Sequence, residues 1–133
     1  MKPQSTPSDS LSSPKEFPLK DLTGKIISCA IAVHSILGPG LLESVHEEAL
    51  SCEFELRGIP FERQKEIFLK YKGRAVGFLI DDQVILELKA VEVIHPIYEA
   101  QLLTYLRATG KRVGLLMNFN VERLKDGIKR LII

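Results

Sequence analysis

The chain has 133 residues, of which 45% are hydrophobic and 26% are charged, and its formal net charge is +1. This length suits one domain with a single core, and the ordinary composition excludes a disordered, collagen-like or disulfide-framework protein. The near-zero net charge excludes a uniformly basic coat protein for nucleic acid, so any contact with nucleic acid must be local.

The N-terminal segment differs in composition from the rest of the chain. Residues 1–20 are rich in serine and proline and hold too little apolar surface to offset the entropy of ordering, so we expect a disordered tail followed by a folded domain over residues 21–133. The first residues lack the apolar segment of a signal peptide, and no later run approaches the ~20 apolar residues of a membrane helix. We therefore expect a cytoplasmic protein without membrane contact.

Two helices are predicted next. Apolar residues recur at helical spacing from Leu22 to Leu37, until the sequence Gly-Pro-Gly at residues 38–40 interrupts them. A second apolar stripe predicts a helix from Leu41 to Arg57, with Gly58 as its C-terminal cap.

The period then changes to the alternation of strands. Residues 67–72 predict a strand that ends in a turn at Lys72-Gly73, and residues 75–80 and 83–90 predict a hairpin closed by Asp81-Asp82. A two-residue turn there pairs Ile80 with Gln83 and Val76 with Glu87.

The rest of the chain returns to a helix and a buried strand. Residues 97–109 predict a helix capped by Gly110, residues 113–119 a buried strand, and residues 127–133 a final strand or helix end. This order predicts an α/β fold in which helices flank a mixed central sheet, built from a three-strand meander and one or two further strands.

The segment Glu87-Leu88-Lys89 is the most informative for chemistry. Side chains two residues apart in a strand share a face, so Glu87 and Lys89 project together while Leu88 points the other way. A carboxylate can ligate Mg²⁺, and a neighbouring ammonium can orient water or stabilise the developing charge of a phosphate. A salt bridge on a half-exposed strand explains the same pattern.

Two helices add polar residues at suggestive positions. Glu43 falls in the first turn after Gly40, with His46 one turn later, although an acid is favoured at a helix N-terminus for the dipole alone. On the third predicted helix Tyr98, Gln101 and Tyr105 form one stripe, which a solvent-facing margin also explains.

The phrases GLLE, ELK and QLLTY, in this order, resemble the RecB-like branch of the PD-(D/E)XK nuclease superfamily, and more closely the small stand-alone family named GxxExxY. The resemblance runs from about Leu22 to the C-terminus. It implies a restriction-endonuclease-like core and metal-dependent cleavage of phosphodiester bonds in nucleic acid, with DNA favoured over RNA. The implied cofactor is Mg²⁺ or Mn²⁺, and the oligomeric state stays open.

The resemblance also assigns roles to individual residues. The implied catalytic residues are Glu43, Glu87, Lys89, Gln101 and Tyr105. The implied metal ligands are Glu43, Glu87 and the carbonyl of Leu88, and the implied substrate contacts are His46, Tyr98 and Arg107.

The chain departs from the family pattern at two positions. His46 stands at the tyrosine of the GxxExxY motif, and Gly77 stands where the family carries its main metal-binding Asp, roughly ten residues ahead of the Glu. Asp82 cannot replace it, because it lies five positions before Glu87, ~17 Å away along a strand. Two functions therefore stay open: a metal-dependent nuclease with weak ion binding, or a catalytically inactive nuclease fold that binds nucleic acid or a protein.

Overall fold

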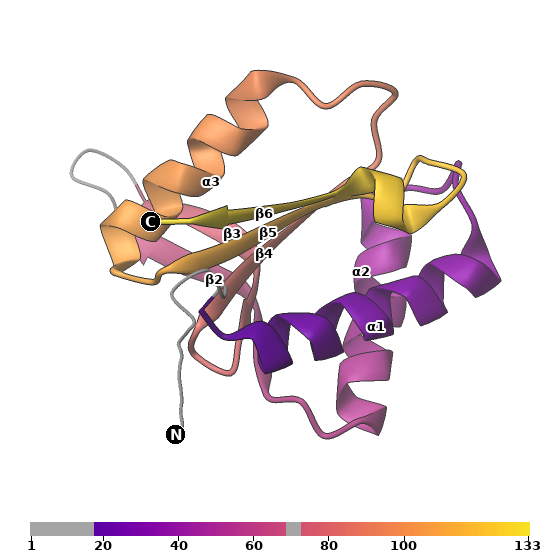
Figure 1. Cartoon of the computed structure of the whole chain (residues 1–133), viewed down its shortest axis with the longest axis horizontal. Helices are drawn as coiled ribbons and strands as arrows, with labels where there is room; N and C mark the ends of the chain where they lie inside the picture. The colour runs from indigo at the N-terminus through magenta and orange to yellow at the C-terminus, as the bar shows by residue number, and fades with distance from the viewer. Residues whose placement is uncertain (1–17, 69–72) are drawn as a thin grey trace, which may run out of the picture.

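The structure, a computed structural model, describes residues 18–68 and 73–133 (Figure 1). Residues 1–17 of the predicted tail lie outside the described residues. Lys72, the first residue of the turn predicted at Lys72-Gly73, also lies outside them. The elements are α1 (Lys20–Leu37), α2 (Glu43–Leu56), β2 (Phe61–Phe68), β3 (Gly73–Ile80), β4 (Val84–Lys89), α3 (Pro96–Thr109), β5 (Val113–Asn118), the short 3-10 helix η1 (Leu124–Gly127) and β6 (Ile128–Ile132).

The five strands form one mixed sheet in the order β2-β3-β4-β5-β6. All neighbouring strands are antiparallel except β4 and β5, which are parallel and joined by the crossover helix α3. The predicted α/β fold, with a three-strand meander, two further strands and flanking helices, is confirmed. The last segment, predicted as a strand or a helix end, is the strand β6. Within the described ranges, no helix has the length and apolar character needed to cross a membrane.

Helices cover both faces of the sheet (Figure 1). On the face of α1 and α2, Phe78 and Leu86 pack with the helical residues Ile26 and Phe54. On the face of α3, Ile85 packs with a second apolar cluster that includes Leu102. Successive residues of β4 therefore enter opposite cores, as the alternation of a strand requires.

The hairpin between β3 and β4 differs from the predicted one by a single residue. Asp81 and Asp82 form the turn, both with positive φ (50° and 57°), and the N–H of Gln83 donates to the carbonyl of Ile80 at 2.9 Å. Ile80 nevertheless pairs with Val84, so Gln83 is an extra residue between turn and ladder. The predicted pairing of Ile80 with Gln83 is wrong, because the strand begins one residue later.

The corrected register changes which residue of β3 faces Glu87. Pairing of β3 with β4 ends at Phe78 and Leu86, and the next step of the same register places Gly77, rather than Val76, opposite Glu87. Beyond this point β3 continues along β2, and β4 continues along β5. We call the place where the two strands separate, at Gly77 and Glu87, the fork.

The ladder between β2 and β3 is also interrupted beside the fork. Arg63 pairs with Phe78 and Lys65 pairs with Val76, but the ladder skips Gln64 and Gly77 between them. Phe78 is buried under α1 and α2, whereas Val76, two residues earlier, is buried in the cluster of α3. Residues two apart in a regular strand share a face, so the strand rotates at Gly77.

Candidate active site

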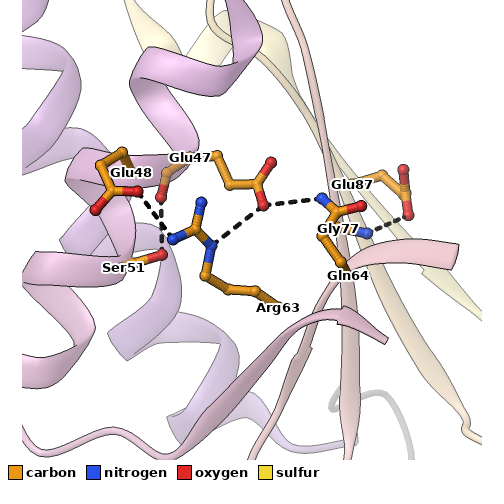
Figure 2. Close-up of polar contacts among 7 residues, drawn as sticks. All are labelled: Glu47, Glu48, Ser51, Arg63, Gln64, Gly77 and Glu87. Carbon is orange, nitrogen blue, oxygen red and sulfur yellow. Dashed lines mark hydrogen bonds and ion pairs between the residues drawn. The ribbon is translucent and has the colours of Figure 1, made fainter. Parts of the chain in front are cut away.

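Glu87 lies at the fork and is held there by the backbone of β3. The N–H of Gly77 donates to Oε2 of Glu87 at 2.9 Å (Figure 2). A Cβ atom at position 77 would lie 3.0 Å from the carbonyl oxygen of Leu86, so the absence of a side chain allows the two strands to approach closely.

The surroundings of Glu87 disfavour a negative charge. Burial raises the pKa of Glu87, whereas the hydrogen bond from Gly77 and the charge of Lys89 lower it. The negative charges of Glu43 and Glu47 raise this pKa further. The charges of Glu43 and Glu47, both on α2, therefore act on Glu87 of β4.

Glu47 is a site residue that the sequence reasoning missed. It lies four residues after Glu43, so the two side chains emerge from the same side of α2, one turn apart. Glu43 is exposed at the start of the helix, whereas the side chain of Glu47 is only 16% exposed. The spacing of four residues was the signal that could have identified it.

Two side chains from β2 reach Glu47 (Figure 2). Its Oε2 accepts a hydrogen bond from Nε2 of Gln64 at 2.9 Å and one from Nε of Arg63 at 3.3 Å. Arg63 also donates through Nη1 to Oε1 of Glu48 at 2.9 Å. These contacts join α2 to the sheet beside the fork.

Lys89 follows Glu87 at a spacing of two residues and contacts α3. Its Nζ lies 4.4 Å from the centroid of the Tyr98 ring, a cation–π contact that holds the ammonium near the N-terminal turn of the helix. The same charge acts on Glu87. Glu87, Lys89 and Tyr98 are therefore neighbours.

The other predicted site residues occupy varied positions. Gln101 is half-buried on α3, and Arg107 is exposed in its last turn. Tyr105 is 6% exposed and packs in the apolar cluster between α3 and the sheet, while the side chain of Leu88 is buried on the opposite face.

Residues 20–131 match the PD-(D/E)XK nuclease superfamily, which accounts for most of the chain. The chain belongs to the PD-(D/E)XK nuclease superfamily. A search of curated proteins gave no match. Superfamily membership implies possible nuclease activity on nucleic acid, and these nucleases typically use a divalent metal.

The residues of this PD-(D/E)XK chain fit a metal ion that is held by one or two carboxylates and by water. Among the residues that the structure describes, no three acidic, histidine or cysteine side chains surround a common point. Mg²⁺ is usually bound through one or two carboxylates and keeps several waters, so a full protein cage is not required. Carboxylates are also hard oxygen donors of the type that Mg²⁺ and Mn²⁺ prefer.

His46 is placed in the core rather than at the substrate side expected from the sequence. It is 1% exposed, and its ring centroid lies 4.5 Å from that of Phe119. Burial, and then the charge of His34, lower the pKa of His46, so the ring is neutral. Both of its ring nitrogens lack a hydrogen-bond partner among the described residues.

Replacing His46 with phenylalanine should stabilise the protein. A buried polar group without a partner costs about 1–3 kcal/mol, and phenylalanine keeps a ring against Phe119 without that cost. We expect the free energy of unfolding in urea to rise by about 1 kcal/mol. His34→Phe is the matched control and should lower it, because Nε2 of His34 bonds the carbonyls of Phe119 and Val121 at 3.2 and 2.9 Å. A less stable His46→Phe protein would contradict this account.

Asn118, also missed from the sequence, fixes the chain that follows Lys89. It is 3% exposed at the end of β5. Its Oδ1 accepts from the N–H of Val91 at 3.1 Å, and its Nδ2 donates to the carbonyl of Val91 at 2.8 Å. The carbonyl of Lys89 accepts from the N–H of Phe119 at 2.8 Å. The route from Lys89 to α3 is thereby fastened to β5.

Proposed function

We propose that this PD-(D/E)XK protein is a divalent-metal-dependent nuclease whose active site is the fork between β3 and β4. The observation that supports this most strongly is the environment of Glu87. Its side chain is half-buried, accepts a backbone hydrogen bond, and lies in the field of Glu43 and Glu47. A bound cation would relieve the repulsion among these carboxylates.

The proposal assigns Glu43, Glu87 and the carbonyl of Leu88 to the binding of Mg²⁺ or Mn²⁺. The bound ion supplies a Lewis acid for the phosphodiester and lowers the pKa of a water molecule. Lys89 orients the attacking water or stabilises charge on the phosphate. The Tyr98 ring supports this role, because its face holds the ammonium of Lys89.

The remaining residues to which the proposal assigns a role lie on α3. Gln101 and Tyr105 orient Lys89 or the phosphate, and the exposed Arg107 contacts the backbone of the nucleic acid. DNA is the first substrate to test, before RNA. We also assign the chain to the GxxExxY group, with Gly77 at the position of the motif Asp, and we therefore expect weak ion binding.

The test is calorimetric titration with Mg²⁺ and Mn²⁺, combined with cleavage assays on DNA and RNA. Lys89→Met keeps the aliphatic stem and removes the ammonium, so it should leave ion binding in place and slow cleavage by at least about 100-fold. Lys125→Met, on the exposed η1, is the matched control and should cleave like the wild type. A wild-type protein that binds neither ion and cleaves neither substrate would refute the nuclease.

A second function is favoured by one observation, the backbone N–H of Gly77 at the place where an acid is expected. In this alternative the fold binds nucleic acid or a protein without cleavage. Binding of labelled DNA, measured by fluorescence anisotropy, would then be the same with chelator as with Mg²⁺ and would be insensitive to Glu87→Gln.

A further inference from the structure

The end of β4 beyond the fork is paired with a neighbouring strand on one side. The ladder with β3 reaches Leu86, whereas the ladder with β5 continues to Lys89, which lies level with Asn118. A strand end that is bonded on one side opens more readily than the centre of a sheet. The backbone of Lys89 therefore depends on β5 for a fixed position.

The side chain of Asn118 extends this pairing past the last backbone partners. Its Oδ1 accepts from the N–H of Val91 at 3.1 Å, and its Nδ2 donates to the carbonyl of Val91 at 2.8 Å. A primary amide carries the same donor and acceptor as a peptide group, so Asn118 bonds Val91 as a further strand residue would. We call these two bonds the clamp.

A third bond fixes the orientation of the amide in the clamp. The N–H of Asn120 also donates to Oδ1 of Asn118, at 3.1 Å. Two backbone N–H groups therefore meet the same atom, which must be the oxygen, because an amide nitrogen accepts no such bond. Nδ2 is then the atom that faces the carbonyl of Val91.

The clamp lies two residues from the carbon stem that carries the ammonium of Lys89. Between them, the carbonyl of Lys89 accepts from the N–H of Phe119 at 2.8 Å, so residues 89–91 are fastened to the end of β5. Nζ of Lys89 lies 4.4 Å from the centroid of the Tyr98 ring, and Tyr98 packs against the apolar cluster under α3. The clamp holds one side of this contact, and the packing of α3 holds the other.

Packing alone does not account for an amide at this position. Asn118 is 3% exposed, and the residues before it in β5, Leu115, Leu116 and Met117, are buried and apolar. An apolar side chain would continue this pattern without the cost of burying a polar group. What asparagine adds is the set of bonds that fixes the chain after Lys89.

We propose that Asn118 is a positioning residue for cleavage, which holds the backbone of Lys89 where the strand has lost its support from β3. This inference rests on the proposed nuclease function. Asn118 acts through the backbone and binds neither the ion nor the substrate. The side-chain amide takes the place of a strand neighbour at the point where the catalytic ammonium must be held.

The test begins with Asn118→Ala, which removes all three bonds of the side chain. We expect kcat for DNA cleavage, per folded molecule, to fall by about 10- to 100-fold, because a displaced catalytic group costs that much. KM for DNA and the Kd for Mn²⁺ should not change, since Glu87 keeps its own bond from Gly77. Asn120→Ala is the matched control and should cleave like the wild type, because its backbone N–H still bonds Asn118.

A double-mutant cycle shows whether Asn118 acts through Lys89. In the Lys89→Met background, Asn118→Ala should have no further effect on kcat. A purely structural role would lower the melting temperature and leave kcat of the folded protein unchanged. The inference is overturned if folded Asn118→Ala cleaves at the wild-type rate, or if its effect is as large in the Lys89→Met background as in the wild type.

Hydrogen exchange of the wild type tests the clamp without any variant or activity. The amide proton of Val91 should exchange as slowly as those of the ladder between β4 and β5. An unprotected Val91 amide overturns the inference. A wild type that cleaves neither DNA nor RNA refutes the proposed function and the inference with it, and protection at Val91 then shows that the failure lies in the function rather than in the clamp.

Discussion

Replacing Glu87 with glutamine should remove divalent-ion binding and nucleic-acid cleavage while making the metal-free protein more stable. Glutamine keeps an acceptor for the N–H of Gly77 but carries no charge into a site where burial, Glu43 and Glu47 disfavour one. We expect the melting temperature at neutral pH to rise by roughly 3–6 °C, the change that about 1 kcal/mol produces in a domain of this size.

The stability gain should depend on pH in a defined direction. The pKa of Glu87 is raised in the folded protein, so at neutral pH its ionised form opposes folding. As the pH falls and this carboxyl becomes protonated, the cost disappears, and the melting temperatures of wild type and Glu87→Gln should converge. Glu92→Gln, in an exposed loop, is the matched control and should match the wild type in ion binding. Retained ion binding by Glu87→Gln would contradict the assigned site.

Gly77→Asp should have the opposite effects. The new carboxylate would lie across from Glu87, and its Cβ would lie 3.0 Å from the carbonyl of Leu86. Both this close contact and the repulsion between the two carboxylates should lower the melting temperature of the metal-free protein by several degrees. With Mg²⁺ present we expect tighter binding, by about tenfold, and partial recovery of stability, because a ligand at about 100 times its Kd adds roughly 2.7 kcal/mol. The rate of nucleic-acid cleavage should rise together with the affinity for Mg²⁺.

Gly77→Asn separates the two causes of the stability loss. It has the same steric contact as Gly77→Asp without the charge, so it should stay destabilised and gain no ion affinity. Calorimetry and thermal unfolding of the wild type, Gly77→Asp and Gly77→Asn measure the ion affinity and the melting temperature of each protein. Unchanged affinity in a folded Gly77→Asp protein would refute the assignment of Gly77 to the motif Asp.

The fold class was predictable because its signals are local. Helical spacing ends at Gly38, and branched residues fill the strand before Lys89, so both boundaries follow from the sequence. The register of the hairpin was not predictable from the same signals. Asp81-Asp82 indicates a tight turn, but a residue such as Gln83 fits equally in a turn or at the start of a strand.

Neighbouring residues of the candidate site could be predicted from the sequence only where they lie on the same helix or strand. The alternation of β4 places Glu87 and Lys89 together, because a strand has a period of two. Helical spacing relates His46 to Glu43, but it does not show what covers each side of the helix. The residue that buries His46 is Phe119, which is far away in sequence.

The fork also divides β3 into two parts that can unfold separately. Residues 78–80 of β3 are bonded to strands on both sides, whereas residues 73–76 pair with β2, and Val76 packs in the apolar cluster under α3. Amide protons in this arm should exchange through local openings that cost less free energy than global unfolding. Such an opening moves Gly77 away from Glu87, so the local stability of the arm sets how readily a ligand reaches that carboxylate.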